Sequence, residues 1–441
     1  MDTNEQRQES QQNRREERHK RRQRSQIIAY TVVGIMILVL AAGIVFAVSK
    51  ITGMSHDRQE QQNRLDDIIV SEETITAPTE PVETVPELTN EQKLDKIIDE
   101  AIIQNMPLED KVAGLFITTP ESITGVSAAV QAGDGTKDAL SKYPVGGIVY
   151  AAKNIQSADQ LKQMIDNTKL YTSYPLFIAI DGEGSGTDAV AAAGLGTKTD
   201  SPETIGASGD ANNAYTAGTT VGSYLAELGF NLDFAPAADL KVVDGNAAGS
   251  SSYGTDAATV ASFVTGMQTG LQEQKVTAAI GHFPGIGSTT QSTKNGMAST
   301  DRSAEDFRAN EFAVFQSCID SGETKMITVS NMAAPSLTGD NTPCSFSSAV
   351  VTDILRNELN FRGVIVSGAM NQTAITNYYG ADEAAVLALR AGCDMIYAPE
   401  NFETAYNGVL EAVQNGTISE ERVNDSLRRI YRIKYADKIE Q

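Results

Sequence analysis

Histidine, cysteine and tryptophan are scarce in this chain of 441 residues, which has three histidines, three cysteines and no tryptophan. The cysteines, Cys318, Cys344 and Cys393, stand at spacings typical of neither a metal site nor a redox-active pair. An odd number of cysteines also gives no complete disulfide framework. We therefore expect ordinary core or surface thiols, and a functional site that uses neither a metal nor another cofactor.

Basic residues are also fewer than acidic residues. Lys and Arg number 35 against 57 Asp and Glu, which gives a formal net charge of −22. Because nucleic acid binding needs clustered Lys and Arg, this balance argues against a nucleic acid partner. A dense basic cluster does occur within residues 1–26, between Arg14 and Arg24.

Charged residues are missing from residues 27–48, a run of 22 that reads IIAYTVVGIMILVLAAGIVFAV. At about 1.5 Å per residue, such a helix spans roughly 33 Å, enough to cross the hydrocarbon core of a bilayer. The basic segment should stay in the cytoplasm and leave the rest of the chain outside the cell. A cleaved signal peptide is the alternative, but its apolar region usually has only about 7–15 residues. We predict a single-pass anchor in the cell membrane.

Sustained apolar periodicity is absent between residues 49 and 88, where stretches such as SEETITAPTEPVETVPEL are acidic and rich in Thr and Pro. This composition is typical of a disordered linker. Folding should resume at Thr89, which can form a capping box with Gln92. We therefore predict four parts: a cytoplasmic tail at 1–26, a membrane anchor at 27–48, a linker at 49–88 and a folded domain at 89–441.

The folded domain repeats one pattern, in which a short apolar run leads through a loop into a longer helical segment. Continuous apolar runs are typical of parallel strands that are buried on both faces. Eight such units predict an α/β fold, the (β/α)8 TIM barrel, over a doubly wound open sheet. No glycine-rich nucleotide fingerprint follows the first run, which also disfavours the open sheet. The eight runs are 114–118, 145–151, 175–181, 230–236, 276–282, 325–331, 363–368 and 393–399.

Polar residues stand where these strands end, which is where a TIM barrel carries its chemistry. Each of them could instead cap a helix or satisfy a loop, but several on one rim favour a ligand site. A metal site made by His282, Asp181 and Asp233 has suitable ligand types but no compact spacing. The candidate ligand-binding residues are Asp181, Glu183, Asp233, His282 and Asn331.

Motifs in the same order resemble glycoside hydrolase family 3, specifically its bacterial β-N-acetylhexosaminidase branch. The resemblance runs from Leu94 to about Ile439, rests on LEDKVAGLF, GFNLDFAPAADL, LRNELNFRGVIVSG and LRAGCDMIYAP, and covers the N-terminal barrel domain of the family. It implies a substrate with terminal β-linked N-acetylglucosamine, such as a peptidoglycan fragment.

The resemblance also shows that the catalytic positions are substituted. The family pattern Lys-His-Phe-Pro-Gly-His-Gly-Asp-Thr corresponds here to GHFPGIGST, so its lysine falls on Gly281. The family's Asp–His acid/base pair falls on Ser292 and Lys294, and its nucleophilic aspartate falls on Gly368. A retaining glycosidase needs a carboxylate nucleophile and a proton donor, and glycine and serine supply neither.

The substrate-binding arginine of the family falls on Ser251, and Asn331 aligns with a family histidine. Replacement chemistry could use an inverting pair of carboxylates about 6.5–9.5 Å apart. The carboxylates open to such a pair are Asp181, Glu183, Asp233, Asp239, Asp382 and Glu383.

Three hypotheses follow. The first is a catalytically impaired member that binds cell-wall glycan or an envelope protein partner. The second is an active β-N-acetylhexosaminidase with relocated catalytic groups. The third is a structural scaffold of an envelope assembly. Whether the protein is an enzyme stays open on the sequence, because fold alone does not carry function.

Overall fold

The computed structural model describes residues 89–182 and 188–436. The predicted tail, membrane anchor and linker all lie outside these residues, as does Glu183. Within the described ranges, no helix is both long enough and apolar enough to cross a membrane. The first described helix, α2 (Asn90–Ala101), begins at the predicted capping box, where the Thr89 side chain accepts from Gln92 N and the Gln92 side chain accepts from Thr89 N.

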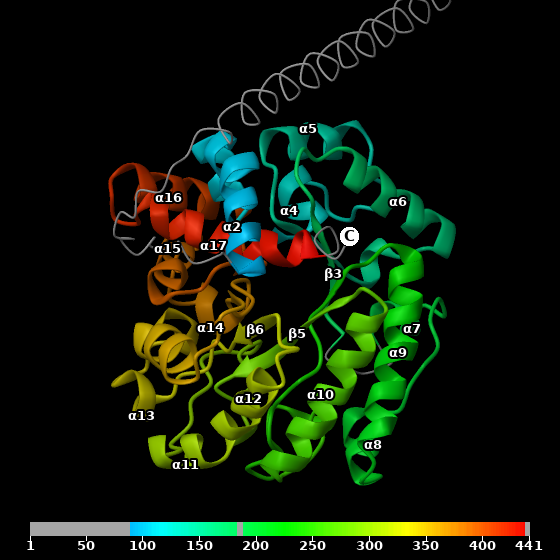
Figure 1. The fold of residues 1–441 in the computed structure, drawn as a ribbon, viewed down its shortest axis with the longest axis vertical. Helices are drawn as coiled ribbons and strands as arrows, with labels where there is room; N and C mark the ends of the chain where they lie inside the picture. Colours follow the sequence, from blue (N-terminus) through cyan, green and yellow to red (C-terminus); the bar gives the residue numbers. More distant parts are fainter. Residues whose placement is uncertain (1–88, 183–187, 437–441) are drawn as a thin grey trace, which may run out of the picture. The chain divides into compact units, whose positions relative to one another are not determined.

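Eight parallel strands form the centre of the domain (Figure 1). Seven of them lie within the predicted runs, and β5 extends one residue beyond its run, to Phe283. Neighbours pair in the order β7-β6-β5-β4-β3-β2-β1-β8. A parallel bridge between Val366 and Met395 then joins the two ends, with Ser367 N donating to Met395 O at 3.0 Å. The sheet is thus a nearly closed parallel α/β barrel. The strands are β1 (Phe116–Thr118), β2 (Gly147–Tyr150), β3 (Phe177–Ile180), β4 (Leu232–Asp233), β5 (Thr277–Phe283), β6 (Met326–Val329), β7 (Val364–Val366) and β8 (Ile396–Tyr397).

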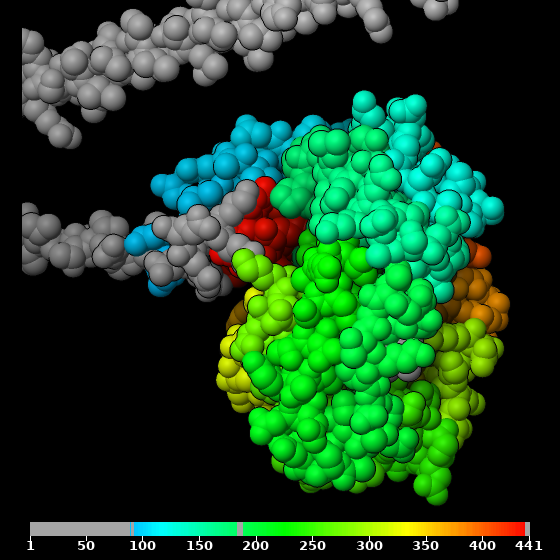
Figure 2. Space-filling view, turned by 90° about the vertical axis from the view of Figure 1, so that its right-hand side faces the viewer, coloured from blue at the N-terminus to red at the C-terminus, as the bar shows by residue number. Residues whose placement is uncertain are grey.

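Helices surround the strands, and the face turned to the viewer in Figure 2 is closely covered by side chains. The first half of the domain contains α3 (Leu108–Ala113), α4 (Pro120–Thr124), α5 (Asp134–Lys142), α6 (Ala158–Leu170), α7 (Ala189–Ala192), α8 (Pro202–Ala207), α9 (Ala211–Leu228) and α10 (Ala257–Glu273). The second half contains α11 (Ala304–Ala309), α12 (Glu311–Asp320), α13 (Pro335–Thr338), a π-helix (Ala349–Glu358), α14 (Thr373–Thr376), α15 (Ala381–Ala391), α16 (Phe402–Gln414) and α17 (Glu420–Lys434). Short 3-10 turns are Ile103–Asn105, Ala152–Asn154, Gly249–Ser251, Ile286–Ser288 and Cys344–Phe346.

Side-chain caps fix where the longer helices begin. The hydroxyl of Ser157 accepts from Gln160 N at the start of α6, and Asp256 does the same for Thr259 N at the start of α10. Each such cap satisfies a backbone N–H that has no partner within the helix. At the other end, α9 stops at Gly229, whose φ of 96° is a left-handed conformation that glycine adopts without strain.

A buried ionic cluster lies before β8 and ties the last helix to the strands. Asp394 is fully buried and accepts from Arg356 Nη2 at 2.7 Å and Arg429 Nη1 at 2.9 Å, and Arg422 Nη1 lies 3.6 Å away. It also accepts from Ile365 N at 2.9 Å. The three guanidinium groups hold the pKa of this carboxyl below its usual range, despite the opposing effect of burial.

All three cysteines are buried free thiols, and none is part of the site described below. Burial raises the pKa of each of these thiols to about 12. Because the thiolate is the reactive form, they are core residues without nucleophilic character.

Candidate functional site

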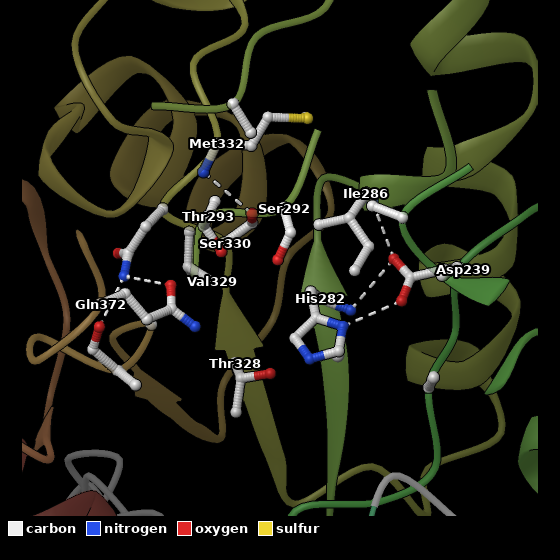
Figure 3. A pocket seen from close by; sticks show the side chains of 18 of the residues that line it. Asp239, His282, Ile286, Ser292, Thr293, Thr328, Val329, Ser330, Met332 and Gln372 are labelled. Carbon is white, nitrogen blue, oxygen red and sulfur yellow. Dashed lines mark hydrogen bonds and ion pairs between the residues drawn. The ribbon is translucent and has the colours of Figure 1, made fainter. Parts of the chain in front are cut away.

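A cavity of about 130 Å³ opens at the carboxyl ends of the strands (Figure 3). This volume holds several water molecules or part of a small ligand. Its wall takes residues from six consecutive strands or the loops that follow them. They include Asp181 after β3, Phe234 after β4, His282 in β5, Asn331 after β6, Gly368 after β7 and Tyr397 in β8.

Asp239 fixes the orientation of His282. Its carboxylate is fully buried, and Oδ2 lies 2.9 Å from His282 Nδ1. The other oxygen accepts from the backbone N–H groups of His282 at 3.3 Å and Ile286 at 2.9 Å. A carboxylate only accepts hydrogen bonds, so Nδ1 carries a proton and donates it to Asp239. The imidazole is therefore held with its Nε2 edge towards the cavity, as Figure 3 shows.

Asn331 is also fully buried and uses both ends of its carboxamide. Its Nδ2 donates to Ala369 O at 2.8 Å and to Gln372 Oε1 at 3.1 Å. Its Oδ1 accepts from the Ser345 hydroxyl at 2.6 Å. Three partners on two segments hold this side chain in place, because rotating it would break several buried hydrogen bonds together.

The glycines at positions 281 and 368 adjoin side chains that occupy the space beside them. A Cβ added at Gly368 would lie 2.6 Å from Asn331 Oδ1 and 2.7 Å from its Cγ. A Cβ added at Gly281 would lie 2.1 Å from Thr328 Oγ1. All these distances are shorter than van der Waals contact, so neither position accepts a side chain unless its neighbour moves.

The loop that carries Ser292 and Lys294 is attached to the segment that follows β7. Thr293 O accepts from Ala374 N at 3.0 Å, and Lys294 O accepts from the Thr373 hydroxyl at 2.8 Å. Ser251 and Ile286 complete this part of the cavity wall. The sequence-predicted positions Gly368, Ser292 and Lys294 are therefore brought together around one cavity.

Asp233, which we expected at the rim, is fully buried and does not line the cavity. Its Oδ1 accepts from Gly182 N at 3.1 Å, whereas Oδ2 accepts no hydrogen bond from the described part of the chain. Burial, and then the carboxylates of Asp188 and Asp181, raise the pKa of Asp233 well above its usual range. Phe234, the next residue, lines the cavity, so strand alternation turns Asp233 to the other face of the sheet, where it lies close to Asp188 and to Tyr224 of α9.

Asp181 does line the cavity, where its Oδ2 accepts from the Tyr397 hydroxyl at 3.4 Å. The Tyr397 ring stacks on Phe234, with ring centroids 4.4 Å apart and an interplanar angle of 29°. This pair forms an apolar face next to a carboxylate, an arrangement that suits the apolar face and hydroxyl groups of a sugar.

Two carboxylates considered for replacement chemistry lie elsewhere. Asp382 and Glu383 belong to the first turn of α15, and Asp382 packs on Gly408 of α16. The described residues contain no group of three or more His, Cys, Asp or Glu placed to hold a metal, and this includes the combination of His282, Asp181 and Asp233.

Sequence reasoning missed Gln372 and Thr328 as cavity residues, and treated Asp239 only as a member of a replacement pair. Asp239 is the penultimate residue of the motif GFNLDFAPAADL, which gave a signal for it. Gln372 and Thr328 belong to no motif, and only the packing between neighbouring strands reveals them.

The chain matches the glycosyl hydrolase family 3 N-terminal domain over residues 108–433. A β-hexosaminidase of Nitrosomonas eutropha is 31% identical over 263 residues, which are 58% of this chain and 74% of that protein. A β-N-acetylglucosaminidase/β-glucosidase of Cellulomonas fimi is 25% identical over 301 residues, which are 66% of this chain and 52% of that protein.

Superpositions on solved structures point to the same family as the sequence matches. A family 3 β-N-acetylglucosaminidase from Paenibacillus sp. superposes with a TM-score of 0.69 at 29% identity, over 76% of this chain and 64% of that one. This chain thus spans somewhat less than two thirds of that protein. A β-N-acetylhexosaminidase from Beutenbergia cavernae gives a TM-score of 0.65 at 26% identity, over 74% of this chain and 98% of that one. The chain therefore belongs to glycoside hydrolase family 3, in its β-N-acetylhexosaminidase branch.

Proposed function

We propose that this protein binds a glycan with terminal β-linked N-acetylglucosamine at the barrel cavity and hydrolyses it poorly or not at all. The observation that carries this proposal is the pair Gly368 and Asn331. The family resemblance puts the nucleophile at position 368, where glycine has no carboxylate, and the locked Asn331 carboxamide fills the adjoining space. A covalent glycosyl-enzyme intermediate has no atom on which to form there.

Proton transfer is weakened as well. The family's acid/base pair corresponds to Ser292 and Lys294, so neither a carboxylate nor an imidazole stands at those positions. A serine hydroxyl needs an activating base before it can exchange a proton at neutral pH. Loss of both catalytic groups removes the two steps that a retaining glycosidase requires.

Part of the binding side of the cavity remains, although the family's substrate-binding arginine corresponds here to Ser251. His282 is held by Asp239, and Asp181 lies beside the stacked rings of Phe234 and Tyr397. These groups offer hydrogen-bond partners for hydroxyls and an apolar face for the ring of a sugar. They support glycan binding in preference to a purely structural scaffold.

The cellular setting of this proposal comes from the sequence. The uncharged run at 27–48 and the basic segment before it support a membrane anchor with the barrel outside the cell. A glycan of the cell wall, or an envelope protein that carries one, would then be within reach of the domain at 89–441 through the linker at 49–88.

An active enzyme with relocated groups is the second candidate. The observation in its favour is the contact between Asp239 and His282, because a carboxylate that orients an imidazole is a common device for general base catalysis. His282 and Asp181 line the same cavity and would have to act together on water.

The deciding experiment incubates the full chain with an aryl β-N-acetylglucosaminide over a wide pH range and titrates it with N-acetylglucosamine. Saturable binding that Asp181→Ala abolishes, without turnover, supports the proposal. Turnover lost in both His282→Ala and Asp181→Ala supports relocated catalysis instead. Absence of both binding and turnover would favour the scaffold. The single variant Gly368→Asp should not gain activity, since Asn331 blocks its side chain.

A further inference from the structure

The carboxamide of Gln372 has a fixed orientation on the cavity wall. Ala369 O can only accept a hydrogen bond, so the Asn331 atom that contacts it at 2.8 Å is Nδ2. The same nitrogen contacts Gln372 at 3.1 Å, so the Gln372 atom that faces it is the oxygen. The Ser345 hydroxyl fits this assignment, because it donates to Asn331 Oδ1.

This orientation turns the Gln372 Nε2 group towards the cavity (Figure 3). Nε2 carries two N–H donors and no lone pair that accepts a hydrogen bond. The other polar side chain on this wall, Ser367, is already occupied, since it donates to Gly368 O at 2.9 Å and accepts from Tyr397 N at 3.0 Å. Gln372 is thus the group through which the wall after β7 meets a ligand.

The wall after β7 therefore offers a ligand donors in place of acceptors. Between Ser367 and Gln372 no side chain carries a charge, and Gly368 carries no side chain at all. A ligand group that can only donate hydrogen bonds, such as a ring ammonium, would face the N–H donors of Gln372. Two donors that face each other form no hydrogen bond, which is unfavourable. A carbonyl oxygen makes a hydrogen bond at the same place.

We propose that Gln372 makes this cavity selective for sugar ligands that present a carbonyl oxygen, as in a sugar lactam or lactone, over sugars with a basic ring nitrogen. The inference rests on the proposed glycan binding and names the ligand class of that same site. The relay from Ser345 through Asn331 to Gln372 is the positioning device, because it prevents the Gln372 amide from turning its oxygen to the ligand.

The test compares two ligands that differ only at the group in question. One is the 1,5-lactam of N-acetylglucosamine. The other is the matching 1-deoxy iminosugar, which keeps the same hydroxyl and acetamido groups but has CH₂ for the carbonyl and a basic amine for the amide. Both are titrated calorimetrically into the full chain at a mildly acidic pH, where the amine is protonated.

Wild-type protein should bind the lactam about tenfold or more tightly than the iminosugar, a ratio that corresponds to one hydrogen bond. Gln372→Glu keeps an oxygen for Asn331 Nδ2 but replaces the cavity donor with an acceptor, so the preference should reverse. Gln372→Leu should lose most of the lactam affinity and leave iminosugar binding nearly unchanged. Gln316→Leu in α12, whose side chain instead contacts Asp320, is the matched control and should keep the wild-type ratio.

Equal affinities in the wild type, or a ratio that both Gln372 variants leave unchanged, would overturn the role of Gln372 while leaving glycan binding intact. Failure of the wild type to bind either ligand, or N-acetylglucosamine itself, would overturn both the glycan proposal and this inference. Near-native circular dichroism of Gln372→Glu guards against a folding defect, since its hydrogen bond to Asn331 is retained.

Discussion

The hydroxyl of Thr328 occupies the space that a side chain at Gly281 would need, and Asn331 does the same for Gly368. Thr328 lies in β6, and Asn331 lies just beyond the end of that strand. Two side chains from one strand end therefore fill the space beside two glycines on the flanking strands. At each site, a side chain at the glycine requires the neighbouring side chain to move or to be replaced.

Gly281→Ala should destabilise the domain by about 1–3 kcal/mol, because its methyl group overlaps Thr328 Oγ1. In a Thr328→Ala background, the destabilisation caused by Gly281→Ala should be smaller by about 0.5–3 kcal/mol, which is the range of coupling energies between residues in contact. Urea unfolding of the four proteins measures this coupling. If the changes in unfolding free energy of the two single variants simply add in the double variant, the two residues do not compete for the same space.

Asp233→Asn should stabilise the protein at neutral pH. The raised pKa means that the folded state holds the Asp233 proton better than the unfolded state does. This contribution to stability is full below the unfolded pKa of about 4, and is lost as the pH rises through the folded pKa. The melting temperature of Asp233→Asn should therefore exceed that of wild type by an amount that grows from pH 4 upwards.

The exposed residue Asp244 provides the control for that series. Asp244→Asn should change the melting temperature little at any pH, because exposed charges contribute little to stability. An Asp233→Asn protein that is less stable than wild type at neutral pH would mean that the carboxylate has a stabilising partner after all.

Asp394→Asn should have the opposite pH dependence. Three arginines lower the pKa of Asp394, so its stabilisation is present above the unfolded pKa and is lost as the pH falls through the folded one. Removing the charge leaves the three guanidinium groups without their carboxylate counter-ion. The free energy of unfolding should fall by about 3–5 kcal/mol at neutral pH. Thermal unfolding should show this deficit shrinking in acid. A deficit that stays constant with pH would point to packing as its cause.

Asp239→Asn should switch the tautomer of His282. An asparagine in the same place can keep its oxygen on the N–H groups of His282 and Ile286, and its nitrogen then donates to His282 Nδ1. The ring proton must then move to Nε2. Nitrogen NMR of the imidazoles reports this directly, and with three histidines in the chain the spectrum is simple. An unchanged tautomer would contradict the assignment of the Asp239 contact.

Apolar runs and loop residues were enough to predict the barrel, because strand burial follows from local composition. The same pattern predicted Asp181, His282 and Asn331 at the strand ends, where the structure has them lining one cavity. It overestimated strand length, since β4 pairs over only Leu232 and Asp233 where a run of seven was expected.

What the sequence could not predict depends on contacts between strands. Asp233 and Asp239 are both acidic residues of one motif, yet Asp233 faces the helices that cover the sheet and Asp239 binds the β5 loop. The lock on Asn331 joins residues 331, 345, 369 and 372 through hydrogen bonds that span three loops. Sequence spacing contains no information about which of these meet.

The loop around His282 is held mainly through atoms that every amino acid possesses. Asp239 accepts hydrogen bonds from the backbone N–H groups of residues 282 and 286. Further along the loop, the carbonyl oxygens of Thr293 and Lys294 accept hydrogen bonds from α14. Side chains along this loop can therefore be exchanged during evolution without reshaping it. If catalytic side chains on such a loop were replaced, the backbone of the site would keep its shape. The same cavity could then bind a different ligand.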